Sequence, residues 1–124
     1  MLELFLTFGL RGDYNKLRRL VLKSRIFYPL LKLYEAFHSA FLPINNTIKG
    51  DIYFPHAPYG CFFSTTCVIG KNCTIMQHVT IGSNYVNKGK NDGGAPVIGD
   101  NVFIGAGAKI IGKISTELGA PKMI

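Results

Sequence analysis

The stretch 67-CVIGKNCTIMQHVTIG-82 decides the fold, because its apolar residues recur every six positions. Isoleucine stands at Ile69, Ile75 and Ile81, and small or β-branched residues stand at positions 67, 73 and 79. A helix face would repeat at intervals of three and four, and an isolated strand would alternate in twos. A period of six suits a stacked coil, in which each repeat is a short strand plus a corner turned by Gly, Asn or Asp. The sequence therefore predicts stacked strands with the aliphatic side chains pointing inward.

The same period extends in both directions from this stretch. One step back lies Phe63, and after a gap the pattern returns at Ile98, Ile104 and Ile110. The fifth place of each repeat is small or β-branched throughout: Cys67, Cys73, Val79, Val102, Ala108 and Ile114. The period breaks after Ile81 in the polar, Gly-rich segment NYVNKGKNDGG, which is typical of a loop. We expect an excursion from one coil at about residues 83–96.

A helical pattern precedes the coil. Apolar residues recur at intervals of three and four over residues 13–41, which predicts amphipathic helix. Asp13 suits the N-cap, Pro29 should break or kink the run, and Pro43 should end it. The predicted units are a helical segment at 1–43, a repeat coil at 44–114 and an irregular tail at 115–124.

The tail departs from the repeat. An aliphatic residue should follow at position 116, but the sequence after Ile114 reads STELGAPKMI. A stacked coil needs end caps to close its core. We therefore expect a truncated repeat with an open last coil and a mobile tail.

Composition and charge narrow the class of protein. Hydrophobic residues make up 48% of the chain, which excludes general disorder. The formal net charge is +7, and many of the cations lie in the first third of the chain. A solvated helix face is the favoured reading, and an anionic partner is the alternative: a phosphorylated ligand, a membrane surface reached through the basic helix, or another subunit. The cations come without a motif that reads DNA or RNA, so we expect no nucleic-acid partner.

Neither a secretory signal nor a membrane span is predicted. Glu3 stands where a basic start is needed, and the uncharged stretch from Ile52 to Gly70 contains Pro55 and Pro58. We expect a cytoplasmic protein. Three cysteines lie six residues apart without a Cys-x-x-Cys pair, so we expect no metal site but small buried thiols: Cys61, Cys67 and Cys73.

Three motifs taken together resemble a known family. They are 55-PHAPYG-60, 68-VIGKNCTIMQHVTIGSN-84 and 95-APVIGDNVFIGAGAKIIGKI-114. The chain resembles the hexapeptide-repeat acyltransferases, of the serine acetyltransferase type and its relatives that acetylate sugars in polysaccharide synthesis. The resemblance covers about residues 42–114 and implies a mainly β fold, a left-handed parallel β-helix of about three coils after the helical segment. It also implies a homotrimer, with acetyl-CoA in a groove between subunits.

The resemblance assigns roles to particular residues. His56 matches the family's general base, which would take a proton from an acceptor hydroxyl as it attacks the thioester of acetyl-CoA. His78 is a second catalytic candidate. Backbone N–H groups at the coil corners would hold the developing oxyanion. The residues expected to line the cofactor groove are Gly82, Ala106, Gly107, Ala108 and Lys109. As structural alternatives, His56 would be a turn histidine, His78 an exposed coil residue and His38 a surface or packing residue.

Two departures from the family bear on the reaction. Serine acetyltransferases commonly carry Asp before the base, and here Pro55 takes that place. Their GDRHP segment, whose Arg and His help to hold serine, corresponds here to GGAP, Gly93 to Pro96. The loss of both side chains makes serine a less favoured acceptor and a sugar hydroxyl a more favoured one. The function implied is an acetyl-CoA-dependent O-acetyltransferase acting on a sugar or serine. The alternatives are a truncated, inactive repeat fragment and a β-helical assembly module.

Overall fold

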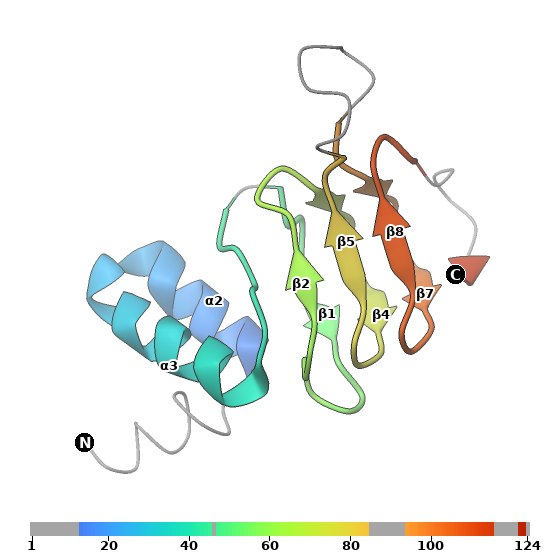
Figure 1. The fold of residues 1–124 in the computed structure, drawn as a ribbon. Helices are drawn as coiled ribbons and strands as arrows, with labels where there is room; N and C mark the ends of the chain where they lie inside the picture. The colour runs from blue at the N-terminus through green and yellow to red at the C-terminus, as the bar shows by residue number, and fades with distance from the viewer. Residues whose placement is uncertain (1–12, 46, 85–93, 116–121, 124) are drawn as a thin grey trace.

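The computed structural model describes residues 13–45, 47–84, 94–115 and 122–123. Two helices lie at one end, and short strands wind away from them in stacked coils (Figure 1). All strand pairs are parallel, and the strands form three sheets. Sheet A holds β2 (Phe62–Phe63), β5 (Thr80–Gly82) and β8 (Lys109–Ile111), and sheet B holds β3 (Val68–Ile69) and β6 (Val97–Ile98). Sheet C holds β1 (Ile52–Tyr53), β4 (Cys73–Ile75), β7 (Val102–Ile104) and β9 (Lys122–Met123).

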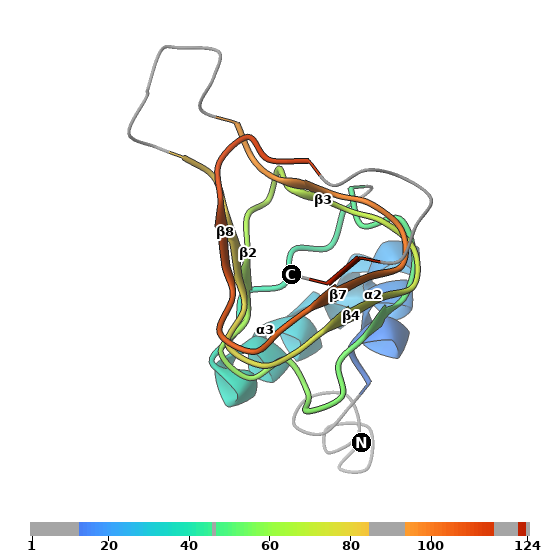
Figure 2. The ribbon, with the colours of Figure 1, turned by 90° about the vertical axis from the view of Figure 1, so that its right-hand side faces the viewer.

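The coil is triangular in cross-section and left-handed. Figure 2 looks along its axis from the C-terminal end, and the chain runs clockwise from β2 through β3 to β4 as it advances toward the viewer. Clockwise advance toward the viewer defines a left-handed coil. The left-handed parallel β-helix predicted from the sequence is therefore confirmed.

The hexad positions build the core of the coil. Ile81 pairs with both Phe63 and Ile110 in sheet A, Ile69 pairs with Ile98, and Ile75 pairs with Ile104. Each of these side chains is at most 5% exposed. The register read from the sequence is confirmed.

Removing a core isoleucine tests this register. Ile75 and Ile104 are both fully buried and lie on top of one another in sheet C. Either Ile→Ala change should lower the free energy of unfolding by about 2–5 kcal/mol, because the rigid stack cannot collapse into the cavity. Denaturant unfolding measures the loss. The exposed Lys71→Ala is the control and should change stability little. An Ile75→Ala protein as stable as the parent would contradict the register.

The fifth hexad places are buried in the middle of the coil but not at its end. Cys67, Cys73, Val79 and Val102 are at most 1% exposed, whereas Ile114 is 48% exposed. A tight turn precedes Ile114: the Ile114 N–H donates to the Gly112 carbonyl at 2.8 Å, and Gly112 has φ 90°. Ile114 nevertheless keeps the coil register, since its carbonyl accepts from the Val97 N–H at 2.7 Å and Ser115 bridges to Val97.

The three cysteine thiols are fully buried, as the sequence predicts. Burial raises the pKa of the Cys67 thiol to about 11, so the thiol stays protonated at neutral pH. Protonated, buried thiols behave as small apolar side chains.

The helices are α2 (Tyr14–Lys23) and α3 (Tyr28–His38), joined by the 3₁₀ turn η2 (Arg25–Phe27). The Asp13 carboxylate accepts from the Asn15 N–H, which confirms the predicted N-cap. The predicted break at Pro29 is wrong: the chain leaves α2 at Ser24, which is extended, and Pro29 lies in the first turn of α3, where its missing N–H costs nothing. The end predicted at Pro43 is also wrong, since α3 stops at His38 with Ser39 in the left-handed region.

In the described part of the chain, no helix combines the length and the apolar character needed to cross a membrane.

Polar side chains of the helices satisfy the open edge of the first coil. Asn15 bonds both the N–H and the carbonyl of Ile52, at 2.9 and 2.8 Å, as a neighbouring strand would. Arg18 donates to the Ile48 carbonyl at 3.1 Å, and Glu35 accepts from the Leu42 N–H at 2.8 Å. Unpaired strand edges invite association, and buried backbone groups need partners. The helical segment is thus a cap on the coil.

At the other end, parallel pairing continues beyond the predicted last repeat. Ser115 forms a bridge with Val97, and β9 pairs with β7, so strand pairing reaches into the segment predicted to be irregular. The expected mobility of the tail concerns mostly residues outside the described ranges. Most of the predicted excursion loop also lies outside them, but its two ends meet, since the Asn84 N–H donates to the Gly94 carbonyl at 3.3 Å.

Candidate active site

Successive turns stack at the corner where sheet C passes into sheet A. We call residues 55–60, 76–78 and 105–107 the stacked corner; the two later turns lie one over the other in Figure 2, between β4 and β5 and between β7 and β8. Gly60, His78 and Gly107 hold the same left-handed conformation, with φ of 68°, 60° and 76°. The His78 N–H donates to the Tyr59 carbonyl at 2.8 Å, and the Gly107 N–H donates to the Gln77 carbonyl at 3.1 Å. Backbone hydrogen bonds therefore tie the three turns together.

His78 is the only one of these three left-handed residues with a side chain. Its ring lies directly over Gly60, because a Cβ added to Gly60 would fall 2.2 Å from the His78 Nδ1. The side chain is nevertheless exposed at its outer side. Gly60 thus leaves room for the imidazole, a role that the sequence analysis did not predict. The signal was available, since Gly60 and His78 stand at equivalent places one coil apart.

His56 lies on the first turn of the stacked corner and its side chain is exposed. The turn is closed by Ala57 N–H to Phe54 carbonyl at 3.2 Å and by Cys61 N–H to Pro58 carbonyl at 3.1 Å. Ala57 adopts φ 58°, in the left-handed region. Since Tyr59 of the same turn bonds His78, the two histidines lie on adjoining turns of one corner.

Four of the five predicted cofactor-groove residues lie in the next layer of the same corner. Ala106, Gly107 and Lys109 are exposed and Ala108 is half-buried. A Cβ on Gly107 would meet no atom within 4 Å, so the space beside this glycine is open. The Lys109 Nζ donates to the His78 carbonyl at 3.2 Å and lies 3.4 Å from the Thr80 hydroxyl, which fixes an ammonium beside His78.

Gly82 lies apart from these four residues. It stands at the far end of β5 and pairs with Ile111 rather than with the corner residues. The Ile111 side chain covers it, with Cδ1 at 3.1 Å from the place of a Cβ. The structure therefore groups His56, His78 and residues 106–109, and leaves Gly82 further along sheet A.

His38 supports the first turn from the helical side. Its ring is 3% exposed, packs against Tyr34 and Tyr59, and shares a hydrogen bond of 2.8 Å between Nδ1 and the Tyr34 carbonyl. Its own carbonyl accepts from the Gly60 N–H at 2.9 Å. Burial lowers the pKa of His38, so the neutral imidazole is the folded form near neutral pH. Of its two predicted roles, the packing role is confirmed.

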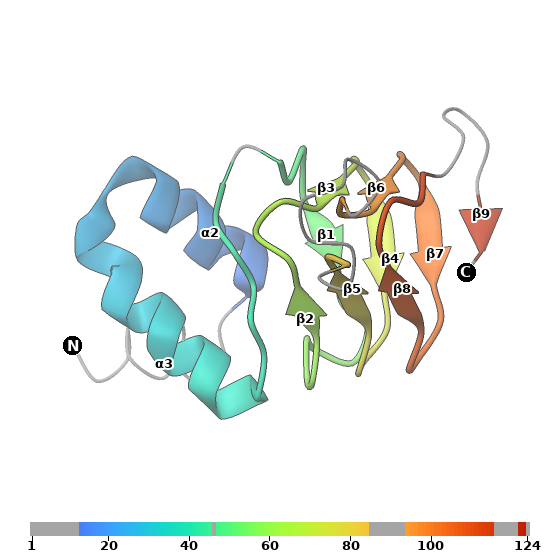
Figure 3. The ribbon, with the colours of Figure 1, turned by 45° about the horizontal axis from the view of Figure 1, so that its top comes forward.

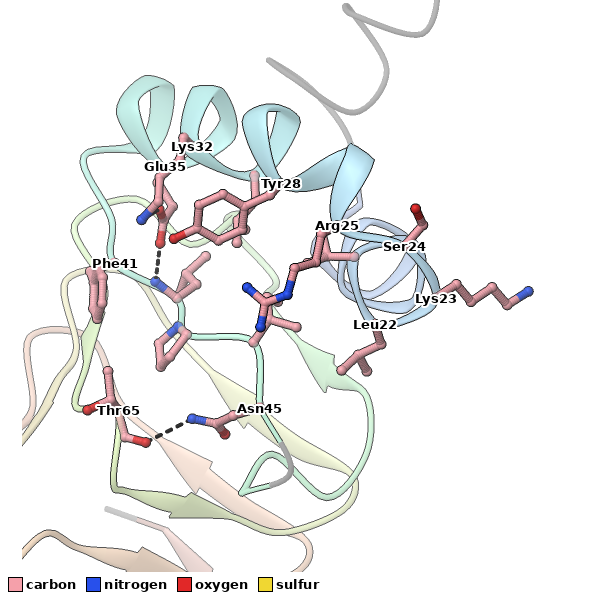
Figure 4. A pocket seen from close by; sticks show the side chains of 15 residues that line it. Leu22, Lys23, Ser24, Arg25, Tyr28, Lys32, Glu35, Phe41, Asn45 and Thr65 are labelled. Atoms are coloured by element: carbon pink, nitrogen blue, oxygen red, sulfur yellow. Dashed lines mark hydrogen bonds and ion pairs between the residues drawn. The ribbon is translucent and has the colours of Figure 1, made fainter.

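Two cavities flank the first coil. One, of about 270 Å³, reaches the His56 turn at Ala57 and Pro58 and is lined from the helices by Asp13, Asn15 and two tyrosines. The other, of about 440 Å³, lies away from the stacked corner, between the α2–α3 connection and the first coil (Figure 4). Of the two, the first reaches the turn that carries His56, although neither His56 nor His78 lines it.

Curated serine acetyltransferases are similar to part of this chain. The enzyme from Staphylococcus epidermidis is 50% identical over 58 residues, which cover 47% of this chain and 26% of that protein. The enzyme from Staphylococcus aureus is 49% identical over 55 residues, which cover 44% of this chain and 24% of that protein. The matched stretch spans about a quarter of these relatives. The search against family models gave no match.

Solved serine acetyltransferases share the fold over most of the chain. The enzyme from Neisseria gonorrhoeae, solved in complex with serine, is 30% identical with a TM-score of 0.57, covering 80% of this chain and 40% of that one. Native serine acetyltransferase 1 from Entamoeba histolytica is 20% identical with a TM-score of 0.60, covering 87% of this chain and 48% of that one. The second likeness concerns the fold alone.

Proposed function

Since this chain is related in sequence and in fold to the serine acetyltransferases, a family of acetyl-CoA-dependent O-acetyltransferases, we propose that it transfers an acetyl group from acetyl-CoA to a hydroxyl of a small acceptor. The observation that carries the proposal is the stacked corner. It joins the His56 turn, the His78 ring and the mostly exposed strip Ala106–Lys109 within three successive layers. An acid–base group and an open strip for the donor are what a direct transfer needs.

In the proposed reaction, the neutral imidazole of His56 takes the proton of the acceptor hydroxyl while the oxygen attacks the thioester carbonyl. The tetrahedral intermediate then expels the CoA thiolate, and the imidazolium returns the proton to its sulfur. An alkoxide is inaccessible at neutral pH without such a base. No covalent enzyme intermediate is required.

The backbone N–H groups of the stacked corner are poorly suited to bind the oxyanion. Those of Gly60, His78 and Gly107 already donate to backbone carbonyls, so our expectation that corner N–H groups would hold the oxyanion fails for these three. Lys109 is the nearby cation, held beside His78 by its bond to the His78 carbonyl. We propose that the Lys109 ammonium stabilises a negative charge, either on a phosphate of CoA or on the oxyanion of the tetrahedral intermediate.

A sugar hydroxyl is the acceptor that we favour over serine. The segment GGAP replaces the Arg and His that hold serine in the resembled family. The cavity beside the His56 turn is lined by aromatic rings and by Asp13, groups that suit a polyhydroxyl ligand. Polysaccharide synthesis in the cytoplasm is the setting that this acceptor implies.

A homotrimer with the donor between subunits completes the proposal. Apolar side chains remain exposed on the outer faces of sheets A and B, with Phe62 at 52%, Ile111 at 47% and Val97 at 43%. Such side chains fit subunit contacts. The open strip at Gly107 would then form one wall of the groove.

Thiol release tests the function. The chain is mixed with acetyl-CoA and, in separate reactions, with a set of sugars or with serine, and free CoA thiol is followed with a chromogenic disulfide. We expect acceptor-dependent release, faster with a sugar than with serine. Release that is no faster with any acceptor than without would favour the alternative, a β-helical assembly module.

A further inference from the structure

Apolar side chains are exposed where the two helices meet. Leu22 is 50% exposed, Ile26 76% and Tyr28 42%. They belong to residues 22–28, which we call the helix tip. Figures 1 and 3 both place the α2–α3 connection at the end of the molecule farthest from β8. Ile26 belongs to this connection, so its exposed side chain lies at one end of the molecule, where contact with water is unfavourable.

Cations surround these apolar side chains. Lys23 and Arg25 flank Ile26 and are exposed, and the outer face of α2 adds a depression lined by Lys16, Arg19, Leu20 and Lys23. The nearby carboxylates are already neutralised. Asp51 bonds Arg19 at 2.8 Å, and Glu35 is buried and bonds Lys32 at 3.1 Å. The helix tip is basic and apolar together.

The cavity of about 440 Å³ opens beside the helix tip. Figure 4 shows the Arg25 guanidinium pointing into it, between Tyr28 and Asn45, while Lys32 lies beside Glu35. Among the described residues Arg25 takes part in no ion pair, so its five donors are available. A guanidinium suits the oxygens of a phosphate.

We propose that the helix tip binds the surface of a membrane containing anionic phospholipid. Ile26 and Leu22 enter the boundary between headgroups and acyl chains, and Lys23 and Arg25 contact headgroup phosphates. A second copy of the chain fits less well, because a symmetric contact would bring two positively charged patches together. The inference does not depend on the proposed acetyl transfer.

Vesicle sedimentation tests this surface. The full chain is incubated with vesicles of phosphatidylcholine, with or without phosphatidylglycerol, and the bound fraction is measured. We expect binding only to the phosphatidylglycerol vesicles, weakened by added salt. Ile26→Ser should reduce the affinity by about tenfold or more. Arg25→Gln and Lys23→Gln should each reduce it by about fivefold.

Matched controls come from the coil. Tyr53→Ser removes an apolar side chain that is 65% exposed, and Lys71→Gln removes an exposed cation; both should bind like the parent. Equal loss in Lys71→Gln and Arg25→Gln would overturn the proposal in favour of net charge alone. Binding unchanged in Ile26→Ser would overturn it too. Full competition by inorganic phosphate at low concentration would also overturn the proposal, because it would indicate that the site binds a free anion. Self-association that depends on Ile26, without binding to vesicles, would overturn it in favour of a second copy of the chain.

Discussion

Gly70→Ala should lower the free energy of unfolding by about 3 kcal/mol or more, as measured by denaturant unfolding. A Cβ at Gly70 would lie 2.5 Å from the backbone carbon and oxygen of Gly99 and from the Asp100 carboxylate. Backbone atoms cannot rotate away, so the two coils must separate at this corner. Separation weakens the bond from Gly70 N–H to Ile98 carbonyl, 2.8 Å, and that from Lys71 N–H to Asp100, 2.7 Å.

Gly94→Ala is the matched control for this change. A Cβ at Gly94 would lie 3.9 Å from the nearest atoms, both in the Lys113 side chain, so stability should change by no more than about 0.5 kcal/mol. Gly70 has a backbone φ that alanine also adopts without strain. The loss of stability in Gly70→Ala should therefore come from the collision of the new Cβ with Gly99 and Asp100, not from backbone strain. Equal stability of the two variants would mean that the coils do not stack as described.

The coil could be predicted because its information is local and repeated. Each inward residue, such as Ile75, recurs six positions on, and the same geometry is imposed at every layer. The break after Ile81 could be placed for the same reason, since an insertion shifts the phase without changing the period. Length, period and phase are properties of the sequence alone.

The cap on the first coil could not be predicted, because it depends on contacts across the chain. Asn15 reads as a polar helix residue, yet it pairs with the backbone of Ile52. Glu35 reads as a surface charge, yet it is buried against the Leu42 N–H. Periodicity shows which face of a helix is apolar but not which backbone groups its polar side chains will meet.

The candidate site residues could be named by resemblance, but their arrangement in space could not be predicted. His56 and His78 were chosen singly by resemblance, and the sequence did not show that Gly60 lies beneath the His78 ring. A left-handed φ at a histidine is uncommon, and here it follows from the coil corner shared with Gly60 and Gly107. Nor could spacing show that Gly82 lies at the other end of β5 from this corner.

His56→Ala should lower acetyl transfer by about a hundredfold or more, because a general base typically contributes about 10²–10⁴-fold. The side chain is exposed on its turn and no core contact is lost, so the variant should fold like the parent. Acetyl-CoA binding, followed by calorimetry, should stay nearly unchanged, since in the proposed reaction the imidazole acts on the acceptor. His56→Ala should therefore lower the turnover number and leave the affinity for acetyl-CoA nearly unchanged.

His78→Ala is the control that separates the two histidines. It removes the ring lying on Gly60 but keeps the backbone bond to Tyr59, so the corner remains stacked. Turnover should fall far less than in His56→Ala. The alanine keeps a side chain at φ 60°, so any loss of stability should be small and can be checked by the same unfolding measurement. If His78→Ala abolished transfer while His56→Ala did not, the base would be His78, acting from beside Lys109, whose ammonium bonds its carbonyl.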